Sequence, residues 1–177
     1  MSISVIQKIA RKGSDKEKIA AEVIKNPEAL PSLFEGLNSD KAAIRYGCEK
    51  ILRFISEKKP ELLYPHFDFF VKMLDSENNF LKWGAIMTIA NLTEADKEKK
   101  FEKIFDRYFS PISGPVMITA GNTIGSAARI ALYKPHLTER VTKKILKVEK
   151  AKYQTKECVN VACGHAIDSF SQFYEKI

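Results

Sequence analysis

The chain has 177 residues and a formal net charge of +7, and 45% of its residues are hydrophobic. This length and composition are typical of one folded domain with a hydrophobic core, and no apolar run reaches the roughly 18 residues of a membrane span. Basic residues are in mild excess towards both ends, which is weaker than the dense basic stripe of a dedicated nucleic-acid module. The N-terminal stretch lacks the apolar segment of a secretion signal, so we expect a cytoplasmic protein.

The first 26 residues contain one clear helix signal. Ser14 precedes Glu17 by three positions, which is the spacing of a capping box, and the apolar periodicity then continues to Lys25. Asn26 and Pro27 end this helix. We expect residues 1–26 to form an N-terminal cap or a partial repeat.

From residue 27 onward the sequence predicts four consecutive pairs of helices within a single domain of residues 1–177. Proline opens three of the pairs, at Pro27, Pro60 and Pro135, where it is tolerated in the first helical turn. The predicted pairs cover approximately residues 27–59, 60–96, 97–134 and 135–177. The second helix of each pair is predicted to end near residue 58, to span 80–92, to span 116–133, and to run from about 156 to the end.

Three of these units repeat one pattern at a spacing of 37 residues. Each has a serine, then an aliphatic residue, then a glycine, in the triplets Ser39, Ile44 and Gly47; Ser76, Leu81 and Gly84; Ser113, Ile118 and Gly121. A period of 20 to 50 residues indicates a repeat architecture. Glycine costs roughly 1 kcal/mol in a helix interior. We therefore expect Gly47, Gly84 and Gly121 to lie where neighbouring helices approach closely.

The repeated segments resemble the HEAT and armadillo-like helical repeats. Leu74-Asp75-Ser76 is followed by Leu81-Lys82-Trp83-Gly84-Ala85, and a related string runs from Leu37 to Cys48. The resemblance covers about residues 27–177. It implies an all-α, right-handed α-α superhelix, or solenoid, of about four helix pairs with an N-terminal capping segment. It also implies a structural Arg45 that pairs with a loop acid of the next repeat, Asp75.

Proteins of this kind are mostly non-catalytic and bind other proteins. The resemblance therefore implies a protein–protein interaction scaffold without catalytic residues. The alternative that it leaves open is a nucleic-acid-binding helical repeat, including the DNA-glycosylase type. That alternative needs a cationic concave face, and the corresponding positions of the middle units are apolar.

The second helices of the middle units are apolar on both sides, which raises the question of what covers their concave face. Three explanations remain open: a partner helix or peptide, a second copy of the chain, or internal coverage by the fold. Helical-wheel positions opposite the repeat stripe, together with one nearby amide, give the candidate binding residues Tyr46, Trp83, Ile86, Ala90, Asn122, Thr123 and Val161. Trp83 is the preferred anchor, although a tryptophan packed between repeats would explain it equally well.

No metal, cofactor or phosphate site is predicted. Cys158 and His165 share a helix face but lie about 10.5 Å apart along it, too far for one zinc ion. We expect the three cysteines, which include Cys48 and Cys163, to be free thiols. A basic cluster near residues 140–150 is diluted by acidic residues, and it is explained either by a solvated face or by a phosphate-binding ridge.

Overall fold

The computed structural model describes residues 4–176, and within that range every regular element is helical and no β-strand occurs. The chain begins with two short helices, α1 (Val5–Ala10) and α2 (Lys16–Lys25). The Asp15 carboxylate caps α2 by accepting hydrogen bonds from two backbone N–H groups at 3.0 Å. The predicted cap at Ser14 is therefore wrong, because the Ser14 hydroxyl instead donates to the carbonyl of Ile9 at 3.0 Å.

Two helix pairs follow. The first consists of α3 (Leu30–Gly36), preceded by a 3-10 turn at Pro27–Ala29, and α4 (Ala42–Lys58). The second consists of α5 (Pro60–Leu63), a 3-10 turn at Tyr64–His66, α6 (Phe67–Met73) and α7 (Asn79–Leu92). Asn78 caps α7 with its side-chain oxygen, which accepts hydrogen bonds from two backbone N–H groups.

Two further pairs complete the described chain. The third joins α8 (Lys100–Phe109) through a 3-10 turn at Ser110–Ser113 to α9 (Met117–Tyr133). The fourth joins α10 (Thr138–Ile145), flanked by 3-10 turns at Pro135–Leu137 and Leu146–Lys150, to α11 (Lys156–Ser171). The bounds predicted for α4, α7 and α9 are confirmed to within a residue. The last helix ends earlier than predicted and is followed by a 3-10 turn at Tyr174–Lys176; residue 177 lies outside the described residues.

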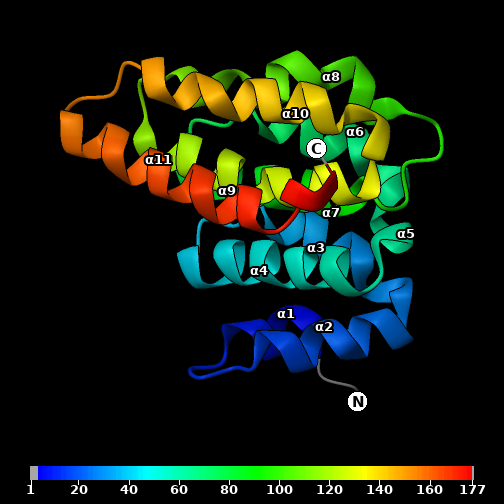
Figure 1. The fold of residues 1–177 in the computed structure, drawn as a ribbon. Helices are drawn as coiled ribbons and strands as arrows, with labels where there is room; N and C mark the ends of the chain where they lie inside the picture. Colours follow the sequence, from blue (N-terminus) through cyan, green and yellow to red (C-terminus); the bar gives the residue numbers. More distant parts are fainter. Residues whose placement is uncertain (1–3, 177) are drawn as a thin grey trace.

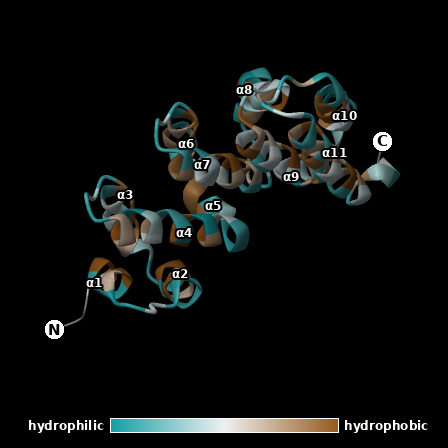
Figure 2. Cartoon of the chain, turned by 90° about the vertical axis from the view of Figure 1, so that its left-hand side faces the viewer, coloured by the Kyte–Doolittle hydropathy of each residue, from teal (hydrophilic) through white to brown (hydrophobic). Residues whose placement is uncertain are grey.

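The helices are arranged in two rows. The second helices α4, α7, α9 and α11 pack side by side in chain order, and α3, α6, α8 and α10 lie on one side of them (Figure 2). The α1–α2 segment packs against α4 at one end of this arrangement, and α10 and α11 form the other end (Figure 1). None of the helices in residues 4–176 combines the length and the apolar character that crossing a bilayer requires.

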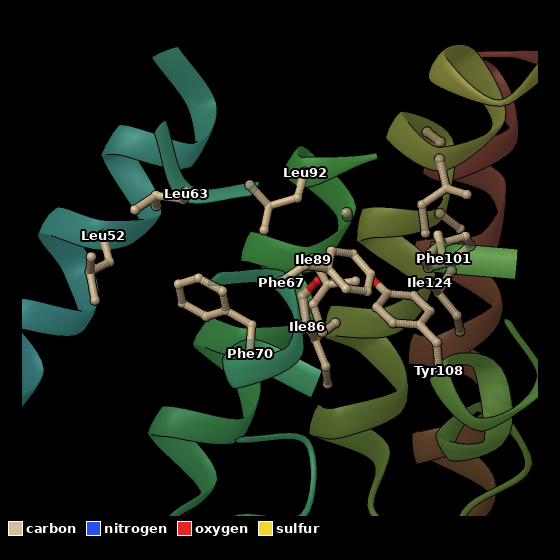
Figure 3. Close-up of a cluster of buried hydrophobic side chains, with 14 of the residues drawn as sticks. Leu52, Leu63, Phe67, Phe70, Ile86, Ile89, Leu92, Phe101, Tyr108 and Ile124 are labelled. Carbon is tan, nitrogen blue, oxygen red and sulfur yellow. The ribbon is translucent and has the colours of Figure 1, made fainter. Parts of the chain in front are cut away.

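The hydrophobic core lies between the two rows. Figure 3 shows its central part, where Phe67 and Phe70 of α6 and Phe101 and Tyr108 of α8 meet aliphatic side chains of α7 and α9. Each of these aromatic residues is at most 2% exposed. Burial of a side chain of this size contributes roughly 1.5–3 kcal/mol, so the row-to-row contact is a main source of stability.

A buried polar network centred on Asp96 connects successive helix pairs at the junction between α7 and α8. The Asp96 carboxylate accepts hydrogen bonds from the Tyr64 hydroxyl at 2.6 Å and from the backbone N–H groups of Lys100 and Phe101 at 2.8 and 3.0 Å. The ammonium of Lys134, at the end of α9, lies 3.0 Å from the same carboxylate and also donates to the Asp96 carbonyl. The network therefore joins the second helix pair to the third.

The three repeated glycines lie at close approaches between neighbouring helices, as the sequence predicts. A Cβ on Gly47 would lie 2.5 Å from the Cγ2 of Ile9, and one on Gly84 would collide with the carboxylate of Glu49. At Gly121 a Cβ would lie 3.2 Å from the Cδ2 of His165. A methyl group at any of the three positions would therefore require a neighbouring side chain to shift, which indicates that glycine is favoured there by close packing.

The predicted pairing of Arg45 with Asp75 is wrong. The Arg45 guanidinium donates to the carbonyl of Ser39 at 2.9 Å, within its own helix pair. Asp75 pairs instead with Arg107 of α8, whose Nη2 lies 2.6 Å from the Asp75 carboxylate and also donates to the carbonyl of Val71. Contacts between first helices, rather than between second helices, bring this acid and its partner together.

Candidate binding groove

A groove of about 700 Å³ opens on the side of the molecule formed by the second helices. Its floor is α9, which contributes lining residues along nearly its whole length. The C-terminal half of α7 forms one wall with Met87, Ala90 and Asn91. His165 of α11 and Gln172, the residue that follows this helix, form the other. Glu57, near the end of α4, closes one corner.

The floor of the groove carries large apolar side chains that are open to solvent. Ile118 is 51% exposed, Leu132 is 45% exposed and Tyr133 is 40% exposed, and all three line the groove. Exposed apolar surface gathered in a concavity is typical of an interaction site. The groove therefore has the shape and chemistry to hold an apolar partner surface.

Charges along α4 are arranged as an internally neutralised row. The Arg53 Nε lies 3.4 Å from a carboxylate oxygen of Glu49, and its Nη1 lies 3.9 Å from Glu57, one helical turn to either side. Glu49 is pressed against Gly84 of α7, and burial raises the pKa of its carboxyl although the Arg53 charge opposes this. Arg53 is thus held between two acids.

Of the predicted binding residues, Asn122 and Ala90 line the groove, but Ala90 is only 1% exposed. The Asn122 amide donates to the carbonyl of Ile118 one turn earlier, at 2.9 Å. Asn122 is therefore the one predicted residue that is both partly exposed and part of the groove.

The prediction that Ile86 and Thr123 face outward is wrong. Ile86 is 1% exposed and its carbonyl accepts a hydrogen bond from the buried Tyr108 hydroxyl at 2.9 Å. Thr123 is fully buried and donates to the carbonyl of Thr119 at 2.9 Å. Both helices are packed on several sides, since α7 contacts α4, α6 and α9, and α9 contacts α7, α10 and α11.

Tyr46 and Trp83 lie outside the groove lining. They are partly buried and form a row with the exposed Phe80, whose ring centroid is 5.1 Å from that of Tyr46 and 5.3 Å from that of Trp83. The Trp83 Nε1 donates to the Thr119 hydroxyl at 3.0 Å, so this tryptophan bridges α7 and α9. The position favours the interpretation that Trp83 packs between repeats.

Val161 of α11 is 47% exposed but does not line the groove. The Tyr46 hydroxyl accepts hydrogen bonds from the Asn78 amide at 3.1 Å and from Arg45 at 3.4 Å. The Arg45 guanidinium also lies 5.0 Å from the centroid of the Tyr46 ring. Together these contacts hold the Tyr46 side chain against neighbouring residues of the same chain.

The sequence did not identify the apolar residues that form the floor of the groove. The repeat aligns Ile118 with Ile44 and Leu81, opposite the predicted outward position of Thr123, whereas the structure leaves Ile118 51% exposed and buries Thr123. The spacing of residues could not have separated the two sides, because Ile118, Asn122, Gly125, Arg129 and Leu132 follow steps of four and three residues, and so do Ala120, Ile124, Ala127 and Ala131 on the buried side.

The cysteines and the basic cluster do not line the groove. Residues 4–176 contain no group of three or more His, Cys, Asp or Glu side chains arranged to hold a metal ion. All three cysteines are free, and burial raises the pKa of the Cys48 thiol to about 11. In the basic cluster, Lys144 lies 2.7 Å from Asp106 of α8, and Arg140 lies above the Phe105 ring at 4.0 Å, so part of the cluster is engaged across α8 and α10.

No protein-family model matches this chain, and no curated protein matches it either.

Proposed function

We propose that the chain is a HEAT-like, right-handed α-α superhelix that acts as a non-catalytic scaffold in the cytoplasm and binds another protein in the groove along α9. The observation that carries the proposal is the groove itself, whose floor leaves Ile118, Leu132 and Tyr133 open to solvent. Leaving such side chains in water forgoes the roughly 25 cal/mol per Å² that their burial would provide, and a partner surface would recover it.

The alternative partner, a nucleic acid, fits the charges of the groove less well. Binding to a phosphate backbone requires several available cations on the contact face. Arg53 is held between Glu49 and Glu57, and Arg129 is the one arginine or lysine among the residues that line the groove. Apolar contacts, rather than phosphate contacts, are therefore the expected basis of affinity.

The proposal is tested by site-specific photo-crosslinking in the source cell extract. A crosslinking side chain at position 118 should capture a protein, and the same side chain at position 146 should not, since Leu146 is 50% exposed but lies outside the groove. Adding Leu132→Asp should abolish the crosslink from position 118, whereas Leu146→Asp should leave it unchanged.

Both aspartate substitutions are at sites of similar exposure, so both variants should fold. Equal crosslinking from positions 118 and 146 would contradict the proposal. Capture of nucleic acid from position 118, with a yield that falls steeply as salt increases, would favour the alternative function instead.

A further inference from the structure

The exposed side of α9 presents a continuous seam along the floor of the groove. Ile118, Asn122, Gly125, Arg129 and Leu132 all line the groove and are separated by steps of four, three, four and three residues. This is the spacing at which one helix meets a second helix that runs alongside it. An extended peptide has a side-chain period of two and would not match it.

The glycine in the middle of this seam has no packing role within the described chain. A Cβ on Gly125 would meet no atom within 4 Å, whereas Cβ atoms on Gly84 and Gly121 would crowd the side chains of Glu49 and His165. Glycine in a helix interior costs roughly 1 kcal/mol relative to alanine. The absence of a side chain at Gly125 would allow the surface of a binding partner to approach the backbone of α9 closely.

The charge of the seam is not balanced within residues 4–176. No carboxylate there lies within salt-bridge distance of Arg129, and the one acid that lines the groove, Glu57, already faces Arg53. Arg129 is thus the one charged residue of the seam and lies between Gly125 and Leu132. A partner that buries this seam needs a carboxylate opposite the guanidinium, because an unpaired buried charge is costly.

We propose that the groove binds an α-helix of a partner protein, laid lengthwise along α9. The helix places a small residue against Gly125, a carboxylate against Arg129, and apolar side chains against Ile118 and Leu132. The 17 residues of α9 span about 25 Å, so the partner helix has four to five turns. This inference rests on the proposed scaffold function and narrows its partner to one class: an amphipathic helix with a small residue and an acid on its apolar face.

The test uses two displayed peptide libraries as probes, one of helix-forming peptides about five turns long and one of proline-containing extended peptides. Selection on the full chain should enrich the helical library, with small and acidic residues spaced three or four apart on the apolar face. Enrichment of extended peptides alone, or of neither library, would overturn the helix inference.

Two glycine variants separate docking from folding. Gly125→Ala should raise the dissociation constant of the selected helical peptide about tenfold or more, as expected when a close helix contact loses more than about 1.4 kcal/mol of binding free energy. Gly164→Ala is the matched control, since it lies in the interior of α11, has open space around it, and does not line the groove. Both variants should keep or raise thermal stability, so lost binding in Gly125→Ala alone cannot be attributed to unfolding.

A charge exchange tests the role of Arg129. Arg129→Glu should weaken binding of the selected peptide. Replacing the acidic residue of the peptide by lysine should restore its binding to the variant. Lys103→Glu on the exposed side of α8 is the control of equal charge change and should have no effect. If the affinity of the selected peptide is unchanged by both Gly125→Ala and Arg129→Glu, the proposed position of the helix is wrong.

The outcome also separates this inference from the scaffold proposal. If the partner crosslinked at position 118 depends on Leu132 but is unaffected by Gly125→Ala and Arg129→Glu, the groove binds a protein that is not docked as a helix. Light scattering provides a further distinction. A dimer that is lost in Gly125→Ala would identify a second copy of the chain as the occupant and would overturn the proposal that a helix of another protein binds there. If no protein is crosslinked, both proposals fail.

Discussion

Asp96 and Lys134 form the most buried ion pair among the described residues, with side chains 0% and 8% exposed. A pair of this kind is stable only when its remaining hydrogen-bonding capacity is used. Here Tyr64, Lys100 and Phe101 donate to the carboxylate, and Lys134 also donates to a backbone carbonyl. The two members are not equivalent, since Asp96 keeps three donors without Lys134, whereas Lys134 would lose its nearest counter-ion without Asp96.

We expect Asp96→Ala to lower the free energy of unfolding by about 3–5 kcal/mol, because it leaves a buried ammonium without its carboxylate. Lys134→Met should cost less, since the aliphatic stem is retained and the carboxylate stays hydrogen-bonded. Urea unfolding followed by circular dichroism measures both values. Equal losses in the two variants would show that the carboxylate's other donors contribute little.

The pH dependence of stability gives an independent check on Asp96. Burial raises the pKa of this carboxyl, but the hydrogen bonds from Tyr64, Phe101 and Lys134 outweigh it and hold the pKa below its ordinary value of 3.8. The carboxylate therefore stabilises the fold above pH 3.8, and the contribution is lost as the pH falls through the lowered pKa. The stability difference between the wild type and Asp96→Ala should narrow in that acidic range.

At the scale of the helices, the glycines fall into two classes that the sequence does not distinguish. Gly84 lies in the interior of α7 and faces the side chain of Glu49 on α4, so a methyl group there has no room. Gly164 lies in the interior of α11 with nothing near its missing Cβ. The same substitution should thus have opposite effects in the two helices.

Gly84→Ala should lower the melting temperature, because Glu49 must move or the α4–α7 contact must open, and this outweighs the helix propensity gained. Gly164→Ala should raise stability by up to about 1 kcal/mol, the propensity difference between glycine and alanine. Thermal unfolding of the two single variants provides the comparison. A stabilised Gly84→Ala variant would mean that α4 and α7 pack less closely than the contact between Gly84 and the Glu49 side chain indicates.

At the scale of the whole molecule, each helix pair contacts mainly the pairs next to it. The α1–α2 segment packs against α3 and α4, and α11 packs against α9 and the turn after α10. In arrays with nearest-neighbour contacts, stability is approximately a sum of local terms, so an end can open while the rest stays folded.

Ile9→Ala is expected to show this locality. Ile9 is 1% exposed and lies against Gly47 of α4, so its truncation should cost about 2–5 kcal/mol locally. Amide hydrogen exchange should accelerate in α1, α2 and α4 and remain unchanged in α9 and α11. Uniform acceleration along the chain would instead indicate a single cooperative unit.

The sequence by itself determined the helical class, the end of α4, the bounds of α7 and α9, and the glycine positions where helices meet. These features depend on local chemistry: prolines open helices, the 3.6-residue period persists within each helix, and a 37-residue repeat places equivalent residues in equivalent contacts. The sequence could not assign the open side of α7 and α9, because a helix apolar all round has no preferred direction.

Only the tertiary structure decided which apolar residues remain exposed and which charges meet. Ile118 is open and Ile86 is buried although both belong to apolar helices, because the number of neighbours around each helix differs from side to side. Asp75 meets Arg107 rather than Arg45 for the same reason: the crossing of distant helices sets the distance between their side chains. Local periodicity specifies each helix, and the packing of helices far apart in the chain specifies the surface.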